Sequence, residues 1–81
     1  MSPEQFRKLK NVKQIDVLFD QGIELMSRIF IFYNIKLYAL HDFFVEVWYM
    51  QTTNRIDRII VLTTEEVMEI YEKKIRLDDL I

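Results

Sequence analysis

Residues 35–50 read IKLYALHDFFVEVWYM, and this stretch decides the fold. On each side of His41-Asp42 it carries a run rich in aromatic and branched aliphatic side chains, which favour β-strands. Aspartate tolerates a left-handed backbone, so His41-Asp42 is expected to form the two-residue turn of a hairpin. That turn fixes the cross-strand pairs, which are Leu40 with Phe43, Tyr38 with Val45, Lys36 with Val47, Ala39 with Phe44, Leu37 with Glu46, and Ile35 with Trp48.

Two further strands flank this hairpin in the sequence. Residues 25–32 predict a strand that ends in a continuous apolar run, with Tyr33-Asn34 as its turn. Residues 51–54 are polar and predict a loop, and residues 55–62 predict the last strand. We therefore expect an antiparallel β-meander of three to four strands.

Two short helices are expected before the sheet, over residues 3–9 and 12–21, and one bent helix over the same residues is the alternative. Ser2 and Gln5 form a capping box around Pro3, which suits a first helical position. The second helix repeats the pattern with a cap from Asn11 to Gln14. Gly22, the only glycine, follows this helix, where it is expected to adopt a positive φ.

A third helix is expected after residue 62. Thr63 and Glu66 form its capping box, and Lys73 and Lys74 would complement the negative end of its dipole. Its apolar stripe includes Val67, Ile70 and Tyr71, and the tail could dock through Leu77 and Leu80.

The sequence thus predicts a single α+β domain over residues 1–81, in the order ααββββα. The helices are expected to cover the sheet face that carries Leu40, Phe43, Val45 and Tyr49. The opposite face would carry Phe44, Glu46 and Trp48 on the side away from the helices. That face has more apolar area than a water-facing side requires.

Composition argues against several classes of function. The absence of cysteine excludes disulfides and thiolate metal sites, and one histidine makes a His-based zinc site improbable. One glycine cannot build a phosphate-binding loop, and a net charge of −2 argues against nucleic acid as a partner. No apolar run approaches the ~20 residues needed to span a membrane, and the N-terminus lacks a signal peptide. We expect a cytoplasmic protein without metal, cofactor or membrane partner.

Glu46 is the most notable carboxylate, because apolar residues surround it. It could serve as an acid or base, or as the polar anchor of a ligand pocket. It could also be a polar residue of the outer face that pairs with Arg58 or Lys36 or is exposed. The ligand or interface candidates are Phe44, Glu46, Trp48, Tyr38 and Arg58. We expect no catalytic residue, since Glu46 has no identifiable second group.

The stretch from Leu37 to Tyr49 resembles a family of small uncharacterised bacterial proteins, with Val45-Glu46-Val47-Trp48-Tyr49 as its most specific element. The resemblance also takes in residues 14–18 and Gly22 upstream, and Asn54, Ile56, Arg58 and Ile59 downstream. That family has no established activity, so the resemblance implies a compact stand-alone domain and no catalytic role.

Two functions remain open on the sequence. The leading hypothesis is a non-enzymatic interaction module that forms a homodimer through the Trp48 face or an edge strand, because a short sheet with exposed aromatics is poorly covered alone. The alternative is a small-molecule-binding protein with a pocket around Glu46 and Trp48. An enzyme that uses Glu46 is the least supported reading.

Overall fold

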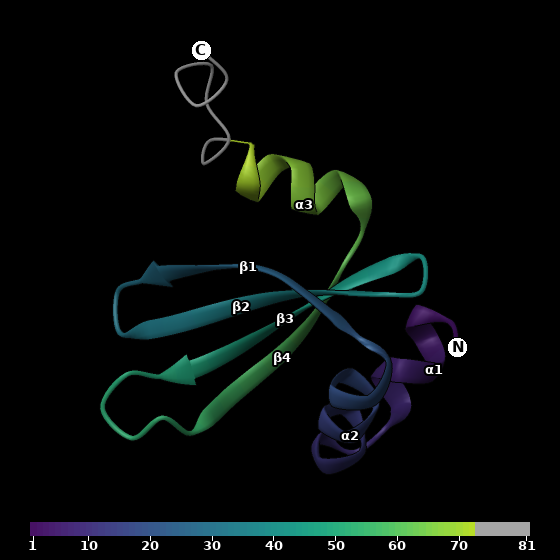
Figure 1. Ribbon diagram of the computed structural model, residues 1–81, viewed down its shortest axis with the longest axis horizontal. Helices are drawn as coiled ribbons and strands as arrows, with labels where there is room; N and C mark the ends of the chain where they lie inside the picture. Colours follow the sequence, from purple (N-terminus) through teal and green to yellow (C-terminus); the bar gives the residue numbers. More distant parts are fainter. Residues whose placement is uncertain (73–81) are drawn as a thin grey trace.

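A computed structural model describes residues 1–72 and has an α+β architecture (Figure 1). The prediction of two N-terminal helices, an antiparallel sheet and a C-terminal helix is confirmed, and the sheet has four strands. The elements are α1 (Pro3–Lys8), α2 (Asn11–Gln21), β1 (Ile23–Phe30), β2 (Tyr33–Leu40), β3 (Phe43–Met50), β4 (Ile56–Leu62) and α3 (Thr64–Tyr71).

The central hairpin of β2 and β3 has the register that its turn predicts. All six expected pairs are present, from Leu40 opposite Phe43 to Ile35 opposite Trp48. The strands lie in the order β1-β2-β3-β4, so β1 and β4 form the two edges. His41, with φ 56°, takes the left-handed position of the turn rather than Asp42.

The turn between β1 and β2 differs from the expectation. Ile31-Phe32 forms it, and Tyr33 and Asn34 already belong to β2, so the prediction of a turn at Tyr33-Asn34 is wrong. Tyr33 is held in the sheet because its ring meets that of Trp48 edge-on, with centroids 5.0 Å apart. The turn therefore falls on two apolar residues, of which Ile31 has φ 55°.

Helices α1 and α2 cover one face of the sheet, as expected. Phe6 and Leu18 are fully buried there against the strands, and Phe6 meets Phe43 edge-on. The sheet residues of this core are Tyr38, Leu40, Phe43, Val45 and Val47. The predicted inward face is thus the one that these two helices bury.

Two local predictions for α2 are wrong. Asn11 is the first helical residue and not the cap, and the side chain of Gln14 is buried and donates to the Phe6 carbonyl at 3.0 Å. Gly22 is extended, with φ −81°. Glycine is needed because a Cβ there would lie 2.6 Å from the Leu18 carbonyl oxygen, not because of a positive φ.

Helix α3 lies on the opposite face of the sheet from α1 and α2, so the expectation that all helices share one face is wrong (Figure 1). Its capping box from Thr63 to Glu66 is present as predicted. Val67, Ile70 and Tyr71 pack with a second core cluster that includes Leu37 and Leu62. The predicted roles of Lys73, Lys74, Leu77 and Leu80 lie outside the described residues.

Candidate functional site

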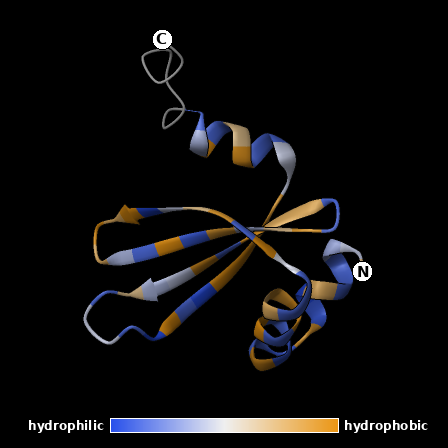
Figure 2. Ribbon diagram, in the orientation of Figure 1, coloured by the Kyte–Doolittle hydropathy of each residue, from blue (hydrophilic) through white to orange (hydrophobic). Residues whose placement is uncertain are grey.

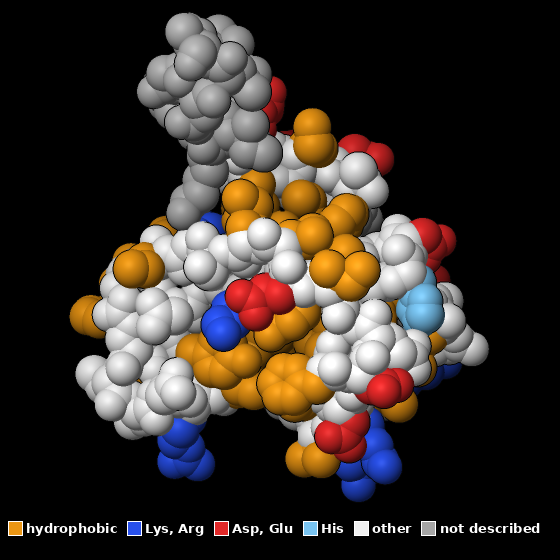
Figure 3. All heavy atoms as spheres, in the orientation of Figure 1, with side chains coloured by type: hydrophobic (Ala, Val, Ile, Leu, Met, Phe, Trp, Pro, Cys, Tyr) orange, Lys and Arg blue, Asp and Glu red, His pale blue; other side chains and the backbone are white. Residues whose placement is uncertain are grey.

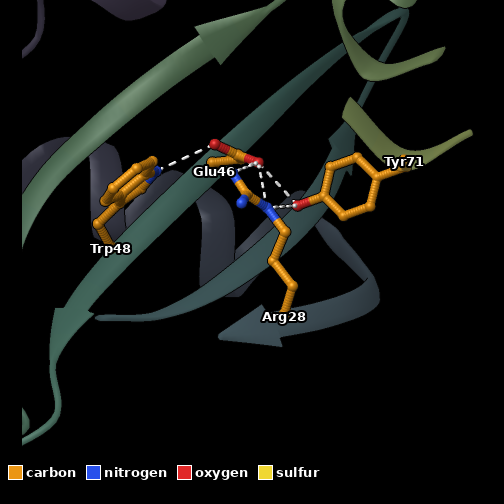
Figure 4. Close-up of polar contacts among 4 residues, drawn as sticks. All are labelled: Arg28, Glu46, Trp48 and Tyr71. Carbon is orange, nitrogen blue, oxygen red and sulfur yellow. Dashed lines mark hydrogen bonds and ion pairs between the residues drawn. The ribbon is translucent and has the colours of Figure 1, made fainter. Parts of the chain in front are cut away.

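Glu46 lies at the centre of a buried polar cluster beneath α3 (Figure 4). Its Oε2 accepts hydrogen bonds from the Tyr71 hydroxyl at 2.7 Å and from Arg28 Nη2 at 3.2 Å. Its Oε1 accepts from the Trp48 indole at 3.0 Å. The residue is 1% exposed, so its charge is balanced inside the protein and not by water.

Three elements bring these side chains together. Trp48 follows Glu46 by two residues on β3, so both point to the same face. Arg28 comes from the edge strand β1, and Tyr71 comes from the last turn of α3. The cluster therefore fixes β1 and α3 to the central strand.

Aromatic rings surround the Arg28 guanidinium. Its Cζ lies 5.9 Å from the ring centre of Phe30, 5.7 Å from that of Trp48 and 5.5 Å from that of Tyr71. Each of these cation–π contacts contributes ~0.5–2 kcal/mol, depending on its exposure. Arginine suits this position because its planar group can stack on rings while donating to a carboxylate.

The sequence did not reveal Arg28 or Tyr71 as partners of Glu46. Arg58 and Lys36 were expected, but Arg58 lies over Trp48 at 5.4 Å and Lys36 pairs with Glu24 at 3.8 Å. Arg28 could have been found only with the register of β1, which the misplaced turn obscured. Tyr71 could have been found only by knowing which face α3 covers.

The arrangement acts as a structural clamp and leaves no accessible acid or base. Both oxygens of Glu46 already accept hydrogen bonds, and almost no surface of the residue meets solvent. Burial and the hydrogen bond to Glu46 raise the pKa of Tyr71 to about 12, so its hydroxyl remains a donor at neutral pH.

The five candidate residues separate into two groups. Phe44, Glu46, Trp48 and Arg58 share the α3 face, where Phe44 packs on the apolar cluster and Trp48 is half-buried. Tyr38 lies on the opposite face beneath α1 and α2. Burial there raises its pKa to about 12, and its side chain is not part of the cluster.

The sequence did not reveal a set of exposed apolar side chains along β1 and its turn to β2, which we call the β1 surface: Ile23, Leu25, Ile29, Phe30, Ile31 and Phe32. Ile29 and Phe30 point to opposite faces of the sheet, because they are neighbours on the strand. Ile29, Ile31 and Phe32 are 70%, 65% and 67% exposed. Figure 2 shows the β1–β2 turn in the colour of hydrophobic residues, and Figure 3 shows hydrophobic spheres at that end of the molecule. The apolar run at residues 29–32 was the available signal, but it predicts the end of a strand and does not show that its side chains are exposed.

Two cavities adjoin β1. One of about 720 Å³ is lined by Ser27, Arg28, Ile29, Asn34, Lys36, Tyr49 and Asn54. The other, of about 290 Å³, has walls of mostly apolar side chains between β1 and α3, lined by Leu25, Met26, Leu37, Val67, Met68, Tyr71 and Glu72. Neither has Glu46 or Trp48 in its lining. The pocket around these two residues stays a prediction.

Comparisons with known proteins find no matching family model and no significantly similar curated protein or solved structure. The resemblance to small bacterial proteins therefore stays a prediction. Within residues 1–72, no helix is long and apolar enough to cross a membrane. In the same part of the chain, histidine and acidic side chains form no group of three that could hold a metal ion.

Proposed function

We propose that this protein is a non-enzymatic interaction module that forms a homodimer through the β1 surface. The observation that carries the proposal is the row of exposed apolar side chains along β1, continued through the β1–β2 turn. Within residues 1–72, β1 is an edge strand and has no strand on its outer side. An edge strand also presents unpaired backbone donors and acceptors, which a second strand can satisfy. An exposed apolar patch beside such an edge is typical of a protein–protein interface.

The conformation of Ile31 supports the same interpretation. A left-handed backbone costs an L-residue about 1–2 kcal/mol, and a β-branched residue is an outlier there. Ile31 has φ 55° and is 65% exposed, so its side chain gains little burial within its own chain. Fully burying an isoleucine contributes ~1.5–3 kcal/mol, so a partner that covers Ile31 would offset the backbone cost.

Most soluble oligomers are symmetric, and two-fold dimers are the commonest. Two β1 edges can pair antiparallel about a two-fold axis, since each supplies the same set of groups to the other. The four strands of each copy then form one continuous eight-stranded sheet.

Sedimentation equilibrium of the full chain tests this proposal, with two charge substitutions as a matched pair. Phe32→Asp places a charge in the β1 surface, and Phe19→Asp makes the same change on α2 at nearly equal exposure, 67% against 65%. We expect the wild type and Phe19→Asp to be dimers and Phe32→Asp to be a monomer. Equal masses for the two variants would contradict the proposal.

A second candidate function is binding of a small acidic molecule in the 720 Å³ cavity. Its size lies within the ~300–1,000 Å³ range of small-molecule sites. Ser27, Asn34 and Tyr49 supply hydrogen-bonding groups to its lining, and Lys36 supplies a cation. Calorimetric titration with phosphate and small carboxylates tests this function. Binding that Lys36→Met removes and Lys13→Met leaves unchanged would support it, and absence of heat with every compound would end it.

A further inference from the structure

We infer that two copies pair their β1 strands so that the β1–β2 turn of each enters the 290 Å³ cavity of the other. This inference rests on the proposed dimer and specifies its interface. The knob is the apolar segment Phe30-Ile31-Phe32, and the socket is the cavity between β1 and α3. Both lie along one edge of one chain, so a single two-fold axis can satisfy both contacts at once.

The socket suits an apolar side chain. Its walls include Leu25 and Met26 from β1 and Val67 and Met68 from α3, and Met68 is 58% exposed. Its volume of about 290 Å³ leaves room for an apolar side chain of a partner.

Strand geometry brings the knob to the socket. Met26, Arg28 and Phe30 point to the α3 face, because they lie opposite Leu37, Ile35 and Tyr33 of β2. In an antiparallel pairing centred on Arg28, Phe30 of the second copy lies directly opposite Met26, on the same face. The turn then extends toward Leu25 and α3, which line the socket.

The same pairing is electrostatically tolerable. It places the two Arg28 residues opposite each other at the axis, where unpaired like charges would be destabilising. Each guanidinium is already paired with Glu46 of its own chain at 3.2 Å and stacked among aromatic rings. The irregularity between Glu24 and Met26 ends the regular edge, so the paired segment is Met26–Phe30.

A membrane is the competing partner for an apolar hairpin tip. A second copy is favoured because the socket lies beside the tip's own strand, and lipid makes no use of it. The net charge of −2 also gives no general attraction to an anionic lipid surface. Flotation with phosphatidylcholine–phosphatidylglycerol vesicles distinguishes a membrane partner from a second copy of the chain.

Crosslinking tests the interface directly, since the chain has no cysteine of its own. The double variant Met26→Cys/Phe30→Cys cannot close a disulfide within one strand, because four residues span ~13 Å and a disulfide requires less than ~7 Å between Cα atoms. A control pair with the same four-residue spacing is Ile56→Cys/Ile60→Cys on the opposite edge strand β4. We expect mild oxidation to link Met26→Cys/Phe30→Cys into covalent dimers and to leave the control unlinked.

A second variant tests the interface in case Met26→Cys/Phe30→Cys does not fold. Met68→Glu changes an exposed residue at the socket and should weaken dimerisation at least about tenfold, because the pairing would bury a charge. A wild-type dimer without the crosslink, and with no effect of Met68→Glu, overturns this interface and leaves the proposed dimer intact. A monomeric wild type overturns both the proposed dimer and this interface. If that monomer also floats with vesicles, the β1–β2 turn binds membranes instead.

Discussion

The substitution Tyr71→Phe removes one hydroxyl from the buried cluster and keeps the ring. That hydroxyl donates to Glu46 at 2.7 Å and accepts from Arg28 Nε at 3.3 Å. A hydrogen bond to a charged group contributes ~1.5–3 kcal/mol, so we expect the free energy of unfolding to fall by that amount. A domain of this length has roughly 4–12 kcal/mol in total, so the loss is readily measured.

Tyr33→Phe is the matched control. Its hydroxyl bonds the Asp57 carboxylate at 3.1 Å at an exposed site, where water replaces the lost partner. The expected loss is below ~1 kcal/mol. Both variants should be made in the Phe32→Asp background, because dimerisation would otherwise make the measured stability depend on protein concentration.

Urea unfolding followed by Trp48 fluorescence measures the loss of unfolding free energy in both variants. The indole reports directly on the cluster because it donates to Glu46. We expect the free energy of unfolding to fall clearly more in Tyr71→Phe than in Tyr33→Phe, while its slope against urea concentration stays the same. Equal losses would show that α3 is not held by the Tyr71–Glu46 contact and would refute the clamp.

Three further predictions concern stability. Burial raises the pKa of Tyr38 and of Tyr71 to about 12, so the stability they contribute is present below their ordinary pKa of 10 and is lost as pH rises from 10 toward 12. Urea midpoints should therefore fall across this window, and less steeply in Tyr71→Phe; identical slopes would count against the burial of Tyr71. Ile31→Gly should leave the stability of the monomer unchanged or raise it by up to ~1 kcal/mol, because relief of the left-handed backbone offsets the flexibility of glycine. The same substitution should weaken the dimer. A loss of stability above ~2 kcal/mol in thermal unfolding would rule out this turn geometry. Gly22→Ala should cost ~1–3 kcal/mol in the same assay, because its Cβ would lie 2.6 Å from the Leu18 carbonyl oxygen; wild-type stability would mean that α2 ends differently.

The parts of the fold that local chemistry determines could be predicted from the sequence. The turn at His41-Asp42 fixed the register of β2 and β3, and the capping boxes at Ser2 and Thr63 fixed the starts of α1 and α3. These signals span only a few residues, so they do not depend on how distant segments pack.

The features that depend on tertiary packing could not be predicted. An apolar stripe shows that α3 buries one side, but not which face of the sheet it covers. Turn propensity favoured Asn34, whereas the contact of Tyr33 with Trp48 moves the turn to Ile31-Phe32. That shift also hid Arg28, which lies 18 residues from Glu46 in the sequence.

The most direct measurement is the molecular mass of the full chain at tens of micromolar, by sedimentation equilibrium and in parallel with Phe32→Asp. We expect twice the 9.9 kDa of one chain for the wild type and 9.9 kDa for the variant. A wild-type mass of one chain at every concentration tested would contradict the claim that the β1 surface binds a second copy.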